Sequence, residues 1–432
     1  MKEKPSTADT RISFTDNLSR LQLLELDACT RCGECLNWCP VYEALRDKAI
    51  TPVEKITAYK NFIHRLHGLR SVLAGPGEMS KEELEQFAEA LYQCTTCGAC
   101  GEACEVGIWT QRLWPTLREK MVQLEVGPIG PQRGMRQVVA EKHNPYGQPP
   151  EARNDWLPEG ITVAPRAEVG YYVGCSGAYV AQPMVRGAVR VLQAAGVTFT
   201  LLDPEEEYCC GFPLYIIGER GLLAELVKHN VEAYMARGVR ELVVSCPCCS
   251  YMIATHWPAL NGGSLPFRVS HITQMVVRKL EEGVLEFRKP LRETITYHDP
   301  CYLSRGLGLT EAPRKVISRF LGARLVEMSR NRRMSRCCGA GGGIRRAYVD
   351  LSFDVSITAI KEAEGTGAGI MAISCPACYE RLHLAMAIRN YETPMRIMDL
   401  MEIAASLLEE EDESSTAGEK PKGEGLPDLP EW

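Results

Sequence analysis

The feature that most constrains this chain is a five-cysteine pattern that occurs twice. Each occurrence consists of a lone cysteine, an adjacent cysteine pair and a CxxC motif, with just over thirty residues between successive parts. A repeat on this scale predicts two structurally equivalent halves. The first occurrence comprises Cys175, Cys209, Cys210, Cys246 and Cys249, and the second comprises Cys301, Cys337, Cys338, Cys375 and Cys378.

The adjacent cysteines restrict which metal the pattern can bind. Structural zinc takes four ligands, usually from two CxxC-like knuckles, and a CxxC motif with three further thiols suits it poorly. A polynuclear iron–sulfur cluster offers several irons, so neighbouring thiolates can bind different irons. Five thiolates exceed the four that a closed cubane needs, which indicates an opened or bridged cluster. Structural zinc sites or disulfides remain the alternative.

Two further cysteine runs precede the repeat. The first is the bacterial ferredoxin run that ends in Cys39-Pro40, and the second ends at Cys104 with Glu105 in place of the proline. In two-cluster ferredoxins the fourth cysteine of each run serves the other cluster. Two zinc knuckles are the alternative. We expect two [4Fe–4S] clusters, one on Cys29, Cys32, Cys35 and Cys104 and the other on Cys94, Cys97, Cys100 and Cys39.

The five-cysteine repeat resembles the CCG domain of the heterodisulfide reductase family. The flanking sequences Gly174-Cys175 and His298-Asp299-Pro300-Cys301 are part of the resemblance, which covers roughly residues 168 to 405. It implies that all five cysteines of each pattern bind a non-cubane four-iron cluster. The expected cofactors are therefore two cubane clusters and up to two non-cubane clusters.

The stretch between Cys39 and Cys94 is too long for a compact bacterial ferredoxin. Thr51-Pro52-Val53-Glu54 and Ser80-Lys81-Glu82-Glu83 have the sequence of capping boxes, so each predicts a helix that begins there. This arrangement resembles the α-helical ferredoxin domain of succinate dehydrogenase and of the small heterodisulfide reductase subunit.

Short β-rich runs alternate with helical stretches in both halves of the repeat, which predicts parallel α/β sheets. We expect an α/β fold with an N-terminal all-α ferredoxin domain and two pseudo-symmetric CCG halves. Cysteines that follow the strands would lie at the carboxyl edges of the sheets, where open α/β folds bind ligands. The predicted strands are 169–174, 197–202, 241–245, 294–297, 324–327 and 370–374, and the predicted helices are 182–195, 219–236, 311–321 and 348–364.

These patterns divide the chain into five segments. The Pro/Gly-rich segment is expected to be a linker along the surface of the second domain, anchored by Trp156. The acidic, low-complexity segment is expected to be disordered. The segments are 1–125 for the ferredoxin domain, 126–168 for the linker, 169–290 and 291–408 for the two CCG halves, and 409–432 for the tail.

Composition indicates the compartment and the partners. A net charge of −6 gives no support to nucleic-acid binding, and nineteen cysteines at ligand spacing indicate a reducing compartment. Residues 1–10 lack a secretory signal, and no apolar stretch reaches about 18 residues, the length for a membrane span. Together with the resemblance, this implies a cytoplasmic protein held at the inner face of the membrane by partners: a membrane cytochrome or quinone-reactive subunit, a multihaem cytochrome or a flavoprotein.

Several residues beside the motifs remain ambiguous. Cys248 is left over after the eighteen ligands, and it is either a bystander or a thiol that exchanges with substrate. The run Gly341-Gly342-Gly343 would let the backbone approach a cluster or a substrate closely. His298 is either a structural residue or a proton donor. The remaining alternative concerns a group of arginines, which form either a solvated face or a dock for an acidic substrate or an acidic partner tail: 330, 332, 333, 336, 345 and 346.

The resemblance implies an iron–sulfur oxidoreductase of a membrane-associated anaerobic respiratory complex. Electrons would pass through the two cubanes to the paired CCG clusters, which reduce or form a disulfide of a small thiol or a protein. The alternative is an electron-transfer subunit that links a flavoprotein dehydrogenase of the glycerol-3-phosphate or glycolate type to quinone. The expected catalytic residues are His298, Cys209, Cys210, Cys337 and Cys338.

Overall fold

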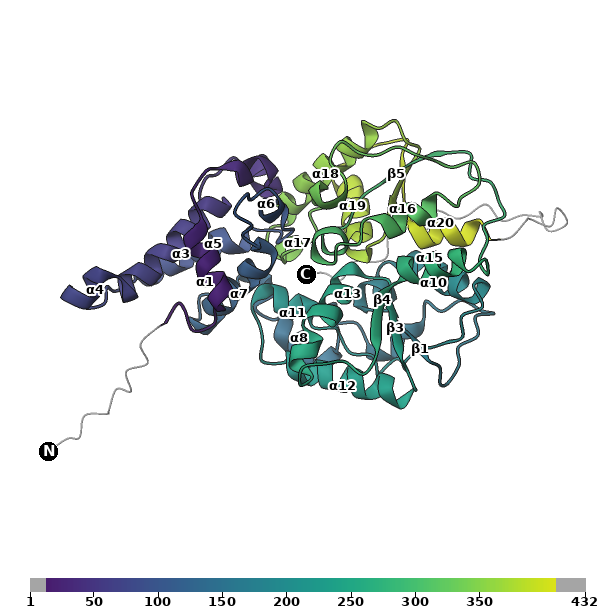
Figure 1. Cartoon of the computed structure of the whole chain (residues 1–432), viewed down its shortest axis with the longest axis horizontal. Coiled ribbons are helices and arrows are strands. Elements are labelled where there is room, and N and C mark those ends of the chain that lie inside the picture. The colour runs from purple at the N-terminus through teal and green to yellow at the C-terminus, as the bar shows by residue number, and fades with distance from the viewer. Residues whose placement is uncertain (1–12, 409–432) are drawn as a thin grey trace.

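A computed structural model describes residues 13–408, in which a helical domain lies beside two α/β halves (Figure 1). The predicted acidic tail lies outside the described residues. None of the helices between residues 13 and 408 has both the length and the apolar character that a membrane crossing requires. In Figure 1 the helical domain is at the left, the second half is at the upper right and the first half lies below it.

Two helices of the helical domain begin at the predicted caps. Ser80 and Glu83 form a reciprocal capping box, with hydrogen bonds of 3.1 and 3.0 Å. The Thr51 side chain accepts a hydrogen bond from the Glu54 backbone N–H at 3.4 Å, the one half of its predicted box that forms. The helices are α1 (Arg20–Ala28), α2 (Pro40–Leu45), α3 (Pro52–His67), α4 (Leu69–Ala74), α5 (Lys81–Tyr92), α6 (Ala99–Glu102) and α7 (Thr110–Gln123), with a 3₁₀ turn at Glu34–Trp38.

Aromatic side chains fill the centre of this domain. Tyr59 and Phe62 lie one turn apart on α3, and both contact Phe14 and the Phe87 ring of α5 with centroid distances of 5.2 to 5.7 Å. Such aromatic contacts add to the stabilisation that comes from apolar burial. The same apolar cluster continues through Leu117 of α7 into the first α/β half, so the domain is packed firmly against the rest of the chain.

Each α/β half contains one four-stranded parallel sheet, which confirms the predicted fold class. The strand orders are β2-β1-β3-β4 and β6-β5-β7-β8, so the two halves share one topology. The strands are β1 (Val169–Tyr172), β2 (Phe199–Thr200), β3 (Glu241–Val244), β4 (Arg268–His271), β5 (Thr294–Tyr297), β6 (Arg324–Leu325), β7 (Ile370–Ile373) and β8 (Arg396–Asp399).

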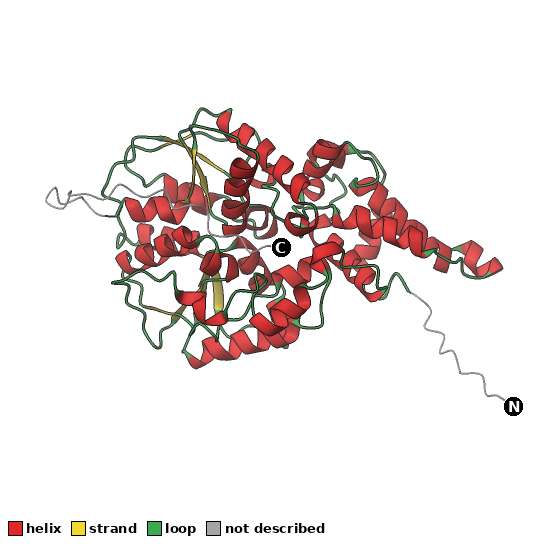
Figure 2. Ribbon diagram, turned by 180° about the vertical axis from the view of Figure 1, so that it is seen from behind, coloured by secondary structure: helices red, strands yellow, loops and turns green. Residues whose placement is uncertain are grey.

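Helices cover both sheets, as the view from behind shows (Figure 2). Those of the first half are α9 (Cys175–Tyr179), α10 (Gln182–Ala194), α11 (Phe212–Ile217), α12 (Leu223–Ala236), α13 (Pro247–Thr255), α14 (Trp257–Leu260) and α15 (Ile272–Glu281). Those of the second half are α16 (Glu311–Ile317), α17 (Ile344–Ala347), α18 (Val349–Glu364), α19 (Pro376–Ile388) and α20 (Leu400–Ser406), with a π-helical turn η4 (Tyr302–Gly306) and a 3₁₀ turn η5 (Arg332–Met334).

The sequence did not predict the fourth strand of either half. Strands β4 and β8 have four residues each, and each runs directly into a helix capped by its last residue, His271 or Asp399. The predicted strands 197–202 and 324–327 shrink to two residues each, because the chain leaves the sheet edge to form the loops that carry the cysteine pairs.

The two halves meet through a pseudo-twofold arrangement of helices. Helix α10 of the first half packs on α20 of the second, and α15 of the first half packs on α16 of the second. Because α10 and α16 are equivalent in the repeat, as are α15 and α20, the two contacts are the same contact made twice. A methyl group at Gly187 would stand 2.6 Å from the Met401 carbonyl oxygen, so α10 and α20 lie almost backbone to backbone.

The segment 126–168 is more than a surface linker. It forms 3₁₀ turns at Gly130–Gln132 and Pro150–Asn154 and helix α8 (Met135–Lys142). Trp156 is fully buried against Tyr171 of β1, with ring centroids 6.4 Å apart. Arg153 is buried as well, and it reaches a cysteine of the repeat.

Candidate metal centres

Four cysteines from both ferredoxin runs surround one cavity of the helical domain, which we call the outer ferredoxin site. Of these, Cys32 is exposed and the other three are half-buried. Burial and the neighbouring thiols raise the pKa of Cys35 to about 12. Thiols this close cannot all ionise without a cation, so the set suits a metal cluster. The lining thiols are Cys29, Cys32, Cys35 and Cys104.

The other four ferredoxin cysteines surround a second cavity, the inner ferredoxin site. Three of them are buried, and burial raises the pKa of Cys39 to about 11. Backbone N–H groups already point at the sulfurs: Thr96 donates to Cys94 at 3.3 Å and Tyr42 donates to Cys39 at 3.5 Å. The lining thiols are Cys39, Cys94, Cys97 and Cys100, so each site collects three thiols of one run and the fourth of the other.

The first CCG site gathers the first five-cysteine pattern at the carboxyl edge of its sheet. Cys175 begins α9 shortly after β1, and Cys246 caps α13 after β3. The Sγ atoms of Cys210 and Cys249 are 3.3 Å apart, and the Cys209 thiol lies within hydrogen-bonding reach of Cys175. All five thiols are buried and converge, which suits a cluster with several metal atoms.

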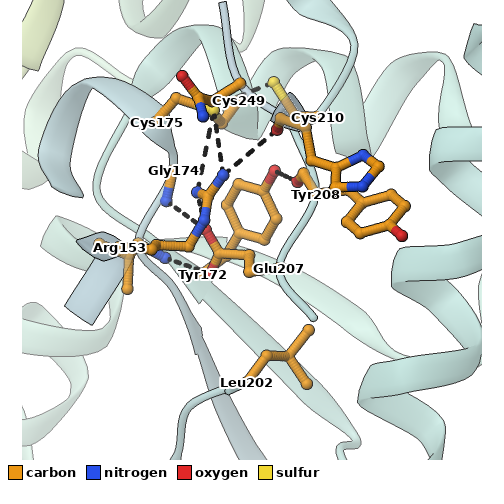
Figure 3. A network of polar contacts seen from close by, with 12 residues as sticks. Arg153, Tyr172, Gly174, Cys175, Leu202, Glu207, Tyr208, Cys210 and Cys249 are labelled. Carbon is orange, nitrogen blue, oxygen red and sulfur yellow. Dashed lines mark hydrogen bonds and ion pairs between the residues drawn. The ribbon is translucent and has the colours of Figure 1, made fainter. Parts of the chain in front are cut away.

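A buried ion pair supports the first CCG site from below (Figure 3). Arg153 approaches the Cys175 sulfur with two nitrogens at 3.8 and 3.9 Å and pairs with Glu207 at 3.0 Å. Glu207 also accepts hydrogen bonds from the backbone N–H groups of Val173 and Gly174 and from the Tyr234 hydroxyl. The guanidinium therefore stabilises the Cys175 thiolate while Glu207 balances its charge.

The second CCG site gathers the second pattern in the same way. The Sγ atoms of Cys338 and Cys378 are 2.9 Å apart. The His298 ring lies beside them, with ligand atoms of the three residues within 4.8 Å of one another. His298 is buried, its Nε2 has no hydrogen-bond partner among the described residues, and burial lowers its pKa to about 4. The imidazole is therefore neutral near pH 7.

The two CCG sites open into one cavity. It is lined by nine of their ten cysteines, the exception being Cys337, and also by Cys248. The Cys246 thiol lies within hydrogen-bonding reach of Cys375, its equivalent in the other half. Cys248 reaches the same two thiols and is not a surface residue remote from the sites. The ligand sets of the two halves therefore touch at the pseudo-twofold axis.

The inner ferredoxin site adjoins the second CCG site. The Cys97 thiol lies within hydrogen-bonding reach of the Cys337 thiol. The Tyr302 hydroxyl donates to the Thr96 carbonyl oxygen at 3.2 Å, and Arg118 of α7 donates to the carbonyl oxygens of Cys94 at 2.8 Å and Gly342 at 2.7 Å. The predicted glycine run approaches the backbone at Cys94 and Thr95, and so joins two domains.

The arginines near the second cysteine pair have partners within this chain. Arg330 lies over the Trp38 ring at 4.6 Å, and Arg333 and Arg336 pair with Glu102 and Glu43 of the helical domain at 2.6 and 2.5 Å. Their contacts therefore hold the helical domain against the second half. Arg332 pairs with Glu311, Arg345 pairs with Glu380, and Arg346 donates to the Pro145 carbonyl oxygen.

Sequence reasoning missed the buried cations that surround these sites. Arg118 and Arg153 lie outside every cysteine motif, and Arg305 lies in a turn between motifs. Local pattern carries no signal for them, because their roles depend on contacts between residues far apart in the chain.

Two protein-family models match this chain. The 4Fe-4S dicluster domain matches residues 25–108, and the cysteine-rich CCG domain matches residues 169–254 and 295–383. These domains fit the predicted two cubane [4Fe–4S] clusters and non-cubane clusters, for which the four thiol sets would supply the ligands. A crystal structure of a hypothetical protein from Helicobacter pylori shares the fold, with a TM-score of 0.55 at 9% identity over 91% of this chain and 74% of that chain.

Two relatives are similar to this chain over most of its length. EtfAB:quinone oxidoreductase of Syntrophomonas wolfei is 27% identical over 90% of this chain, which spans 59% of that relative. The D-type subunit of the dihydromethanophenazine:CoB--CoM heterodisulfide reductase of Methanosarcina barkeri is 37% identical over 91% of this chain and 97% of its own length. With both lengths covered almost completely, the chain belongs to the family of D-type heterodisulfide reductase subunits and is an iron–sulfur oxidoreductase of that kind.

Proposed function

We propose that this chain carries electrons from the ferredoxin domain to the paired CCG sites, where a disulfide bound in their shared cavity is reduced or formed. The observation that carries the proposal is the shared cavity, which is lined by thiols of both halves, among them Cys246 and Cys375. The relative from Methanosarcina barkeri is named for a CoB--CoM heterodisulfide, so a heterodisulfide or another disulfide of small or protein thiols is the proposed substrate class.

The positions of the cysteines suggest a route. When bound, iron–sulfur clusters take up and release one electron at a time, whereas cleavage of a disulfide takes two. Cys32 is exposed, so a donor can approach the outer ferredoxin site. Cys97 of the inner site lies beside Cys337 of the second CCG site. Cys375 then meets Cys246 of the first site. Two adjacent sites can thus supply the two electrons together.

His298 is proposed to act on the substrate sulfur through a hydrogen bond. Its pKa is lowered to about 4, so the ring is not protonated near pH 7. It therefore differs from the proton donor that we expected from the sequence. A neutral ring with hydrogen on Nε2 can donate toward sulfur beside Cys338 and Cys378. We therefore assign it a positioning role.

The donor is proposed to dock at the outer ferredoxin site. Val106 lines the cavity of that site, and Trp109 lies between the lining residues Ile108 and Thr110. Val106 and Trp109 are 49% and 39% exposed, so they offer apolar surface for a partner. A membrane cytochrome, a quinone-reactive subunit, a multihaem cytochrome or a flavoprotein would fit this role. Association with the inner face of the membrane would then come through that partner.

The experiment is anaerobic disulfide reduction with a reduced viologen as electron donor. Cys209→Ser and Cys337→Ser should each abolish turnover, while the electron paramagnetic resonance (EPR) signals of the two ferredoxin sites persist. Each variant removes a thiol from one CCG site only, so both losses are required if the sites act as a pair. Turnover at the wild-type rate in either variant contradicts the paired-site proposal.

A second candidate function is electron transfer between a flavoprotein and quinone without disulfide chemistry. The similarity to EtfAB:quinone oxidoreductase favours it. This candidate predicts that viologen-reduced protein passes electrons to a quinone analogue and leaves every disulfide tested intact. It also predicts that Cys209→Ser, in the site that comes last on the proposed route, retains more quinone reduction than Cys337→Ser.

A further inference from the structure

Arg305 lies between the inner ferredoxin site and the second CCG site. It belongs to the π-helical turn η4 that follows Cys301, and it is 2% exposed. Its Nε donates to the carbonyl oxygen of Cys97 at 2.7 Å. The side chain therefore touches the backbone of an inner-site ligand while its own turn follows directly on a ligand of the second CCG site.

The acceptors around Arg305 are all neutral. Its Nη1 donates to the carbonyl oxygens of Arg333 and Ser335 at 2.7 and 2.9 Å and to the Ser335 hydroxyl at 3.2 Å. Its Nη2 is buried and has no hydrogen-bond partner within the described part of the chain. No carboxylate pairs with Arg305 between residues 13 and 408.

Two other buried arginines beside the CCG sites, Arg153 and Arg314, are each balanced by an acid. Arg153 pairs with Glu207 at 3.0 Å, and Arg314 binds both oxygens of Asp299 at 2.7 Å. An unpaired guanidinium in the interior is costly, because burial removes its hydration and nothing of opposite charge replaces it. The charge of Arg305 is therefore unbalanced unless an anionic group lies beside it.

The nearest candidates for that anionic group are the thiol sets themselves. Arg305 lies one turn after Cys301, and its Nε donates to the Cys97 carbonyl oxygen at 2.7 Å, so its charge lies beside both thiol sets. One cation thus favours negative charge at both sites.

We propose that Arg305 is a positioning residue that raises the reduction potentials of both the inner ferredoxin site and the second CCG site when they hold their clusters. The inference rests on the proposed electron route, in which these two sites are successive. Each electron that arrives adds one negative charge, and a buried positive charge nearby favours that addition. The free Nη2 can also donate to a cluster sulfur, and hydrogen bonds and charge near the sulfurs set such potentials.

At the first CCG site this effect is weaker, because Glu207 offsets the charge of Arg153. The two halves, although equivalent in fold, therefore differ in charge. The second CCG site, which adjoins the inner ferredoxin site, is the one biased to receive an electron.

The test is an anaerobic redox titration followed by EPR, which needs no disulfide turnover. Arg305→Met should shift the midpoint potentials of the inner ferredoxin and second CCG sites to more negative values, whereas Arg305→Lys should retain most of the wild-type values. The outer ferredoxin site serves as an internal reference whose potential stays unchanged. Arg333→Met is the matched control, because it removes an exposed charge that pairs with Glu102 at the surface.

A second pair of variants keeps Arg305 in place, in case Arg305→Met does not assemble. Ser335→Asp would pair with Nη1, 3.2 Å from the present hydroxyl, and Ser335→Asn has the same shape without the charge. The potentials should be more negative in Ser335→Asp than in Ser335→Asn. The inference is overturned if Arg305→Lys and Arg305→Met have equal potentials, or if Ser335→Asp and Ser335→Asn do. If the potentials shift as expected but the wild-type protein reduces no disulfide, the inference stands and the proposed function fails.

Discussion

Gly342 passes so close to Cys94 that a side chain on its α-carbon would overlap the Cys94 carbonyl oxygen. Arg118 holds the two residues together by donating to both of their carbonyl oxygens, at 2.7 and 2.8 Å. The loop after the second cysteine pair is therefore in backbone contact with a ligand loop of the inner ferredoxin site. Any change that separates these backbones should also separate two sites between which electrons are proposed to pass.

Gly342→Ala should weaken the contact between the ferredoxin domain and the second half. The residue has φ +64° and no room for a methyl group, so both strain and overlap oppose the change. We expect a loss of about 1–3 kcal/mol in the free energy of unfolding, as for overpacked cores. Hydrogen exchange should rise in the Cys94 loop. Gly134→Ala is the control, because Gly134 has no atom within 4 Å of the added methyl group and should behave as wild type.

The sequence was sufficient for the grouping of the cysteines that the structure brings together and for the α/β class. Cysteine spacing and strand–helix alternation are local patterns, so they predicted both four-thiol ferredoxin sets and the two parallel sheets. The edge strands β4 and β8 escaped prediction because four residues that lead straight into a capped helix show no clear period-two pattern.

The contacts between sites could not be predicted in this way. Cys97 and Cys337 are adjacent because the helical domain packs against the second half, an arrangement that depends on Arg118, Gly342 and the arginines that reach back to Glu43 and Glu102. Arg153 lies in a segment whose composition suggests only a linker, yet its side chain is buried beside Cys175. These relationships arise from tertiary packing, which single-sequence patterns do not encode.

Arg153→Met should destabilise the first half by leaving Glu207 buried without its counter-charge. Removing one partner of such a pair typically costs about 3–5 kcal/mol. Glu207→Gln added to Arg153→Met should recover part of the loss, because the remaining buried charge disappears. Thermal unfolding of the four members of this cycle measures the coupling. Arg240→Met is the control: its pair with Glu168 is 79% and 73% exposed and should contribute little. Additive losses would contradict the pairing.

Anaerobic iron analysis should give about sixteen irons per chain, at about four for each of the four sites. Cys248→Ala should leave that number unchanged, because Cys248 belongs to neither five-thiol set and Ala377 occupies its position in the other half. Cys375→Ala, which removes a predicted ligand at the same junction, should lower it. A value near eight irons in the wild type would show that the CCG sites do not hold four-iron clusters, and a loss in Cys248→Ala would make that thiol a ligand.

The stability of the second half should fall as pH rises, and Asp399 is one cause. Its side chain caps α20 by accepting a hydrogen bond from the Met401 backbone N–H at 2.8 Å, and burial raises its pKa to about 8. In the unfolded chain an aspartate has a pKa of about 3.9. Between these values the unfolded state has lost the proton that the folded state retains, so unfolding becomes easier as pH increases through this range.

Asp399→Asn keeps an oxygen that can cap the helix but cannot ionise. The melting temperature of Asp399→Asn minus that of wild type should therefore become larger between pH 5 and pH 8. Both temperatures are measured anaerobically by circular dichroism on protein with equal iron content. Asp350→Asn is the control, because the Asp350 side chain is 86% exposed and its neutralisation should give a difference that hardly changes with pH. If the difference between Asp399→Asn and wild type stays constant across this range, Asp399 does not retain its proton in the folded protein.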